Sequence, residues 1–202
     1  FGEIQSYFPW HCTFLNDANA GAFAEGIGSD LPSSFFYLSL SNTVGGAIFH
    51  DGNLLPGDAF RCGEAGHMTL IPDGKPCYCG KTGCVDAYCS ARVLSDLSGG
   101  RLEDFFLGLQ QNNPNYRSVW DTYLKHLAVV INNLHMILDY DIVLGGYVGS
   151  FLTPWLDTIR HLVSERNTFE DDGSFVKLCT YQTGAAAYGA AMDVMEEFLR
   201  TV

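Results

Sequence analysis

A histidine and three cysteines lie close together in this 202-residue sequence and could bind a metal ion. They are His67, Cys77, Cys79 and Cys84, and the Pro and Gly residues between them favour tight turns. Zn²⁺ in structural sites takes four nitrogen or sulfur ligands in a tetrahedral arrangement, and one imidazole with three thiolates is a standard set. The cysteines could instead be small buried hydrophobic residues, but their spacing favours a structural zinc site.

Further polar groups could do chemistry near such a site. Glu64 lies three residues before His67, so a metal bound by the histidine would hold the carboxylate and the imidazole in a fixed geometry. Asn16 and Asp17 precede an alanine-rich segment that is predicted to be helical, and either could serve as its N-cap. The pattern alone leaves the functional and the capping interpretations of this pair open.

The composition excludes several classes of protein. There are 23 acidic and 11 basic residues, which gives a net charge of −12 and disfavours direct binding to nucleic acid. Seven cysteines, with a Cys-x-Cys pair among them, favour reduced thiols and a metal in the cytoplasm over a disulfide framework. No apolar run reaches the roughly 18–20 residues of a membrane span. The sequence opens at Phe1 like the middle of a chain, so we expect further residues upstream.

Hydrophobic patterns predict alternating strands and helices. Strands are expected at 33–41, 44–50, 54–55, 141–144 and 175–181. Helices are expected after Asp17 and at 85–97, 102–110, 120–138, 151–165 and from 183 onward. Strand hairpins followed by alternating helices and strands indicate an α/β or α+β fold with helices on a mixed sheet. Of the remaining features, we expect segment 168–173 to be a solvated acidic loop, and His126 and His135 to be core or partly exposed histidines instead of metal ligands.

Two glycine-containing segments lie where a nucleotide could bind. Thr43, Gly45 and Gly46 belong to the predicted turn between the first two strands, and backbone N–H groups there could approach a phosphate. Gly145 and Gly146 follow strand 141–144 at its carboxyl end, where α/β proteins bind ligands. As a phosphate-binding signal, glycine pairs of this kind are weak because hairpins contain them commonly.

Several collinear blocks resemble the ROK family (repressors, open reading frames and sugar kinases). They are NDANAGAFAEG at 16–26, GEAGHM at 63–68, PCYCGKTGCVDAYCS at 76–90, DIVLGG at 141–146 and TGAAAYGAAM at 183–192. The resemblance implies an actin-like ATPase fold of the ribonuclease H-like, hexokinase-type kind, with a zinc-binding loop in the second lobe. Residues 1–30 would end the N-terminal lobe and form a hinge helix, 31–182 would form the C-terminal sugar- and zinc-binding lobe, and 183–202 would pack back toward the first lobe. The rest of the first lobe, and in some members a helix-turn-helix, would lie upstream.

The resemblance also implies roles for individual residues. In the family, the residues at the positions of Asn16 and Asp17 bind the sugar, and the aspartate is the base in kinases. Glu64 and His67 match further sugar contacts, and Asp86 stands where the family has a sugar-binding glutamate that is one methylene longer. The family's zinc ligands match the one histidine and three cysteines already named.

The phosphate loops favour a sensor over a kinase. One family loop is absent from this chain, and the second reads SNTVGGA at 41–47, where the family usually has Gly-Thr-Gly-x-Gly-Gly-Gly. Tyr147 follows the Gly145-Gly146 pair and would place a ring near the expected adenine pocket. We therefore expect the sugar-sensing effector domain of a transcriptional regulator, which contacts DNA only through an upstream domain. The alternative is a fragment of an ATP-dependent sugar kinase, glucokinase- or fructokinase-like, that uses ATP and Mg²⁺ with Asp17 as base.

Family members commonly form dimers or tetramers, so we also expect a homo-oligomer. Aromatic residues near the middle of the chain suggest one interface. They are Phe105, Phe106 and Tyr116.

Overall fold

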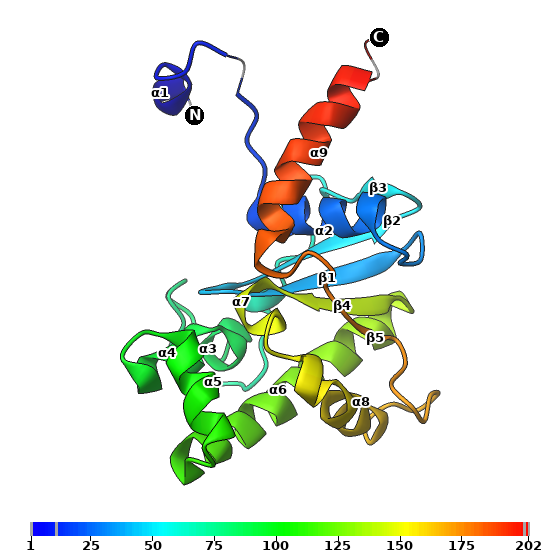
Figure 1. Ribbon diagram of the computed structural model, residues 1–202. Coiled ribbons are helices and arrows are strands. Elements are labelled where there is room, and N and C mark those ends of the chain that lie inside the picture. Colours follow the sequence, from blue (N-terminus) through cyan, green and yellow to red (C-terminus); the bar gives the residue numbers. More distant parts are fainter. Residues whose placement is uncertain (1, 11, 200, 202) are drawn as a thin grey trace.

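The computed structural model describes residues 2–10, 12–199 and 201, and its centre is a five-stranded mixed sheet (Figure 1). The strand order is β3-β2-β1-β4-β5. β1 pairs antiparallel with β2 and parallel with β4, whose other neighbour β5 is also parallel. The strands are β1 (Phe35–Leu40), β2 (Val44–His50), β3 (Asn53–Leu54), β4 (Asp141–Gly145) and β5 (Val176–Leu178).

Helices cover both faces of the sheet. α2 and α9 lie on one face, and the helices from α3 to α8 lie on the other (Figure 1). The α-helices are α1 (Gly2–Gln5), α2 (Asp17–Gly28), α3 (Asp86–Cys89), α4 (Arg92–Ser95), α5 (Leu102–Gln110), α6 (Pro114–Leu138), α7 (Gly146–Gly149), α8 (Leu156–Ser164) and α9 (Ala185–Leu199). Short 3₁₀ turns are η1 (Ala65–His67), η2 (Asp96–Ser98), η3 (Thr153–Trp155) and η4 (Gln182–Gly184). None of these helices combines the length and the apolar character that crossing a membrane requires.

Strand β1 is buried on both faces, which explains its unbroken apolar sequence. Phe36 and Leu38 point into the larger core with α6, whereas Phe35 and Tyr37 belong to a smaller core beneath α2. On that second face α9 packs tightly on α2, because Gly189 lies against the Ala20 carbonyl where a Cβ would not fit. The small residues of the C-terminal helix therefore allow close packing on α2.

The helix predicted at 120–138 is confirmed as α6, which begins earlier than predicted, at Pro114. The Asn113 side chain caps its first turn by accepting hydrogen bonds from the backbone N–H groups of Asn115 (3.0 Å) and Tyr116 (3.3 Å). Trp120, Tyr123 and the apolar residues that follow at helical spacing are buried against β1 and β4. The helix ends where Asp139 adopts a left-handed conformation with φ of 55°.

Some sequence predictions are wrong in their boundaries. The segment expected as one helix at 85–97 forms α3, α4 and η2, with an extended residue, Ser90, between α3 and α4. The reason is a tertiary hydrogen bond from the Ala91 N–H to the Ser41 carbonyl (2.8 Å), which anchors the chain at the end of β1. The expected helix at 151–165 begins only at Leu156, after η3.

The proposed aromatic interface is also wrong. Phe105 and Phe106 are 0% and 5% exposed, because α5 turns this side toward α6, and Tyr116 is half-buried beside them. Phe105 stacks on Tyr116 with ring centroids 4.9 Å apart, and Phe106 meets Trp120 edge-on. These aromatic residues build the core and offer no exposed patch.

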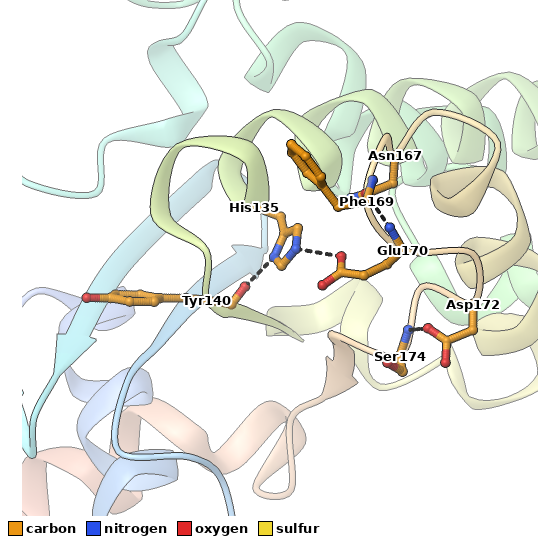
Figure 2. A network of polar contacts seen from close by, with 7 residues as sticks. All are labelled: His135, Tyr140, Asn167, Phe169, Glu170, Asp172 and Ser174. Carbon is orange, nitrogen blue, oxygen red and sulfur yellow. Dashed lines mark hydrogen bonds and ion pairs between the residues drawn. The ribbon is translucent and has the colours of Figure 1, made fainter.

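The acidic loop at 168–173, which was expected to be solvated, is tied to the core through Glu170 (Figure 2). Oε2 of Glu170 lies 2.8 Å from Nε2 of the buried His135, while Nδ1 of His135 lies 2.8 Å from the Tyr140 carbonyl. The imidazole stacks on the Phe175 ring, with centroids 3.6 Å apart. The Asn167 side chain accepts hydrogen bonds from two backbone N–H groups within the loop. His135 is thus the core histidine that was expected, with a carboxylate partner that lies 35 residues away.

Candidate functional site

Asp17 lies at the mouth of a cleft at the carboxyl end of the parallel strands. It is the first residue of α2, and the preceding Asn16 accepts hydrogen bonds from the N–H groups of Ala18 (2.9 Å) and Asn19 (3.2 Å). Asn16 therefore does act as the N-cap, which leaves the exposed Asp17 carboxylate facing a cavity of about 250 Å³. The cleft combines segments that are distant in sequence: Asp17, the β1–β2 turn at Asn42 and Thr43, Gly146 and Tyr147 after β4, and Gln182 and Thr183 after β5.

Gly146 shapes the floor of the cleft. Its φ is 76°, and a Cβ there would lie 2.7 Å from both the Leu40 nitrogen and the Ser41 hydroxyl oxygen. Only glycine fits this position, because it tolerates positive φ and lets the backbone after β4 approach the end of β1. The glycine predicted here for a phosphate loop is thus required by the local backbone geometry.

Gly45 and Gly46 lie within β2, which confirms the strand predicted at 44–50 and excludes them from the turn to which they were also assigned. They pair with Ser39 and Leu38 of β1. Gly46 packs against the Gly63 carbonyl, and a Cβ on Gly45 would come within 3.3 Å of the Ala18 side chain. These two glycines therefore serve close packing, and the turn that borders the cleft consists of 41–43.

Tyr147 separates the cleft from an adjoining cavity of about 280 Å³. Three residues line both cavities, namely Asn42, Tyr147 and Thr183. The two cavities therefore form one elongated depression. The second cavity also includes Phe151 and Ser150, whose hydroxyl is buried and has no hydrogen-bond partner among the described residues. A ligand that is longer than a monosaccharide could extend from Asp17 past the Tyr147 ring.

Behind the cleft lies a buried polar cluster that sequence reasoning missed. The Cys179 thiol donates a hydrogen bond to Oε1 of the fully buried Glu25 (2.9 Å), which also accepts one from the Tyr181 N–H (2.9 Å). The Tyr37 hydroxyl lies 3.8 Å from the same sulfur. Burial raises the pKa of Cys179 to about 12 and holds the pKa of Tyr37 well above its usual range, so both groups keep their protons. No spacing rule links Glu25 to a residue 154 positions away.

The four predicted metal ligands come together. One ligand atom from each of His67, Cys77, Cys79 and Cys84 lies within 4.8 Å of the others, as a common ion requires. Burial, together with hydrogen bonds to the other two thiols, raises the pKa of the Cys84 thiol to about 12. A divalent cation would compensate for the negative charge of several thiolates held so close together.

Backbone hydrogen bonds hold the metal-binding loop in place. Within the loop, the Cys77 N–H donates to the Lys81 carbonyl and the Gly83 N–H donates to the Lys75 carbonyl, both at 2.8 Å. At the start of the loop, Gly66 packs directly on the Val44 carbonyl, where a Cβ would not fit. The GEAGH segment is therefore fixed both to the metal-binding loop and to β2.

The carboxylates predicted to bind sugar occupy different surroundings. Glu64 is exposed and lines a mostly apolar cavity of about 310 Å³ with Arg61, whereas Asp17 lines the cleft. Asp86 is buried, and its Oδ1 accepts a hydrogen bond from the Val44 N–H (2.7 Å). Asp86 thus holds the start of β2 next to the cleft, a role that the sequence did not suggest.

Comparison with known proteins identifies the family. The sequence profile of the ROK family matches residues 2–197. The chain belongs to the ROK family. It is 32% identical over 194 residues to an N-acetylmannosamine kinase of Escherichia fergusonii, which covers 92% of this chain and 65% of the relative. It is 31% identical over 144 residues to the N-acetylmannosamine kinase of Vibrio cholerae, with 68% of this chain and 50% of the relative covered. The chain thus spans between half and two thirds of the length of these curated relatives.

Solved structures agree on the fold. A ROK family glucokinase from Streptomyces griseus, in complex with glucose and AMPPNP, superimposes with a TM-score of 0.81 at 22% identity, covering 95% of this chain and 70% of that one. A ROK family transcriptional regulator, a homologue of the E. coli MLC protein, gives 0.72 at 21% identity, covering 94% and 54%. The chain has the actin-like ATPase fold of ROK hexokinases, and its Cys/His cluster lies where a metal-binding loop was expected.

Proposed function

We propose that this chain is the catalytic, sugar-binding portion of an ATP-dependent sugar kinase. The observation that carries the proposal is the position of Asp17, an exposed carboxylate that lines the same cavity as the β1–β2 turn and Gly146. The relatives named above are N-acetylmannosamine kinases, which favours the kinase alternative over the sensor that the degenerate loops had suggested. An N-acetylated hexosamine is accordingly the proposed substrate class.

The arrangement supports in-line phosphoryl transfer. Asp17 accepts the proton of the attacking sugar hydroxyl while that oxygen bonds to the γ-phosphorus, and the bond to the β-phosphate oxygen breaks to release ADP. Asn42 and Thr43 of the β1–β2 turn line the same cleft as Gly146, and in this proposal their backbone N–H groups bind the phosphates. Mg²⁺ bound to the nucleotide would neutralise the developing charge.

The metal-binding loop supplies a second wall in this proposal. His67, Cys77, Cys79 and Cys84 hold a structural Zn²⁺, which leaves no open position for catalysis. Sugar contacts are proposed for Asn16, Asp17, Glu64 and His67. The carboxylate of Asp86 uses one oxygen for Val44 and offers the other to a sugar hydroxyl.

The test is ATP turnover by the full-length protein that contains this chain, measured with a panel of hexoses and N-acetylated hexosamines. The proposal predicts ADP release that depends on one of these sugars and saturates with it. ADP release that is the same with and without every sugar, in protein that binds sugar measurably, would refute it.

That refuting result would support the second candidate, a sugar sensor. The observation that favours a sensor is the β1–β2 hairpin: Gly45 and Gly46 are committed to β2, so fewer free backbone N–H groups face the cleft than in a glycine-rich phosphate loop. A sensor would bind sugar with the same residues and leave ATP intact.

A further inference from the structure

A smaller cavity of about 170 Å³ lies away from the cleft, between the metal-binding loop and helices α3, α4 and α6. These helices lie together on the face of the sheet opposite α2 and α9 (Figure 1). No residue that lines this cavity also lines the cleft at Asp17. Its polar lining consists of Lys75, Tyr88, Ser118, Thr122, Tyr123 and His126, and its apolar wall is Val93 and Val119.

The two basic residues of the lining both contact Tyr88. Ser118, Thr122 and His126 are spaced by four residues on α6, which puts them in one row on a single face of the helix. Lys75 enters from the metal-binding loop, with Nζ 5.1 Å from the centroid of the Tyr88 ring. The His126 ring meets the same tyrosine edge-on at 5.0 Å. Lysine and histidine therefore approach Tyr88 from two different elements.

The charge of this lining is unusual for the chain. The whole sequence carries −12, yet the residues lining this cavity include two basic side chains and no carboxylate. Burial lowers the pKa of His126, and the positive charge of Lys75 lowers it further. The only other titratable groups in the lining are the phenols of Tyr88 and Tyr123, and the latter donates its proton to the Cys89 carbonyl (2.6 Å). Among the residues that line the cavity, the Lys75 ammonium thus has no carboxylate partner.

We propose that this cavity binds a small organic anion, with its carboxylate or phosphate monoester group between Lys75 and His126. The Ser118 hydroxyl lines the same row and would donate a further hydrogen bond to the anion. Thr122 already donates to the Ser118 carbonyl (3.0 Å), so its side chain serves to fix the row and not to hold the anion. Val93 and Val119 form the apolar wall against which a short hydrocarbon body fits.

The test measures the pKa of the His126 imidazole by NMR in the zinc-loaded full-length protein. The protein is titrated with sodium propionate and, separately, with sodium phosphate. Sodium chloride of equal ionic strength is the control. An anion beside His126 stabilises the imidazolium. We therefore expect the pKa of His126 to rise by about one unit when the anion saturates the site. That rise corresponds to about tenfold tighter binding to the protonated form. A larger rise with propionate than with phosphate identifies a carboxylate ligand, and the reverse identifies a phosphate. A pKa that changes no more with either probe than with chloride overturns the proposal.

Variants locate the effect. Lys75→Met should abolish the anion-dependent rise, whereas Lys81→Met removes the same charge from an exposed position of the same loop, outside the cavity, and should leave the rise intact. Because Lys75 is close to the metal ligands, zinc content is measured for both variants. Ser118→Val is a second test of the site, because Ser118 lies on α6 and not on the metal-binding loop. This variant should weaken anion binding severalfold. Equal losses in the Lys75 and Lys81 variants would indicate nonspecific screening and contradict the site. Sugar-dependent ATP turnover tests the kinase proposal separately.

Discussion

The metal-binding loop and the cleft at Asp17 are built in opposite ways. All four metal-ligating residues fall within 18 positions, 67–84, and backbone hydrogen bonds inside that short segment shape the loop. The cleft takes its walls from four stretches between positions 17 and 186, which meet only because the sheet and its helices bring them together. We therefore expect the loop to depend on a bound metal ion, and the cleft to depend on the packing of the whole lobe. Substitutions in the loop and substitutions in the cleft should therefore affect stability, zinc content and activity differently.

Removing zinc should have the largest effect on stability and should begin in the loop. Chelation, or Cys84→Ser, should lower the free energy of unfolding by about 3–5 kcal/mol, which corresponds to roughly 10 °C in Tm for a chain of this size. Hydrogen exchange should show lost protection across 67–84 while α6 keeps most of its protection. Uniform loss of protection in both regions would show that the loop is not an independent unit.

A methyl group at Gly146 should damage the cleft and spare the loop. Gly146→Ala forces a positive φ on alanine and brings Cβ against Leu40 and Ser41, which together cost about 2–4 kcal/mol. Gly52→Ala is the matched control, because Gly52 also has positive φ (78°) but its Cβ would meet open space. Denaturant midpoints should separate the two variants, and zinc content should stay at one ion per chain in both. Equal midpoints would contradict the close approach at Gly146.

Asp86 follows the metal-binding loop and is hydrogen-bonded to the start of β2, next to the cleft. Its substitution should lower the stability of the protein modestly. Asp86→Ala leaves the buried Val44 N–H without its acceptor, which should cost about 1–3 kcal/mol. Asp86→Asn keeps an acceptor oxygen and should recover about half of that loss, because charge-assisted hydrogen bonds are about twice as strong as neutral ones. Urea unfolding measures both variants. If Asn were no better than Ala, the hydrogen bond to Val44 would not be what Asp86 contributes to stability.

A further predicted effect is a pH dependence of stability that arises from the cluster behind the cleft. The folded-state pKa of Cys179 is raised to about 12, so its stabilising contribution is complete below the pKa of the unfolded thiol, near 9, and is lost as pH rises from 9 toward 12. At pH 10.5 the loss should be on the order of 2 kcal/mol. Cys179→Ser keeps a hydrogen-bond donor for Glu25 and should flatten this part of the stability curve. A variant whose stability falls as steeply as that of the wild type would exclude Cys179 as the source.

The same contrast between local and distant contacts explains how much the sequence could reveal. The cluster around His67 was predictable because its ligands are close in sequence and their types match one ion. Helix α6 was predictable from its periodic apolar face, and β1 from its unbroken apolar run. Each of these signals lies within a single short window of sequence.

Features that depend on distant contacts escaped prediction. The break at Ser90 follows from a hydrogen bond between Ala91 and Ser41, and no local helix-breaking residue marks it. The contacts of Gly46 with Gly63 and of Gly45 with Ala18 join β2 to distant segments, which the predicted strand at 44–50 could not reveal. The pairing of Glu25 with Cys179 joins the two ends of the chain. The proposal of a kinase over a sensor likewise rests on comparison with relatives, because the degenerate phosphate loop pointed to the sensor.

The most direct test of the central claim is the turnover number of Asp17→Asn in the full-length protein, measured with the sugar that gives the highest wild-type activity. A general base contributes about 10²–10⁴ to the rate, so we expect kcat to fall at least about a hundredfold. Zinc content and Tm should stay near their wild-type values. Sugar affinity should fall much less than kcat, because asparagine keeps a hydrogen-bonding oxygen at the proposed sugar contact. Asp30→Asn, which removes an exposed carboxylate just beyond the other end of α2, should retain full activity. A kcat for Asp17→Asn within about threefold of the wild type would contradict the assignment of Asp17 as the base.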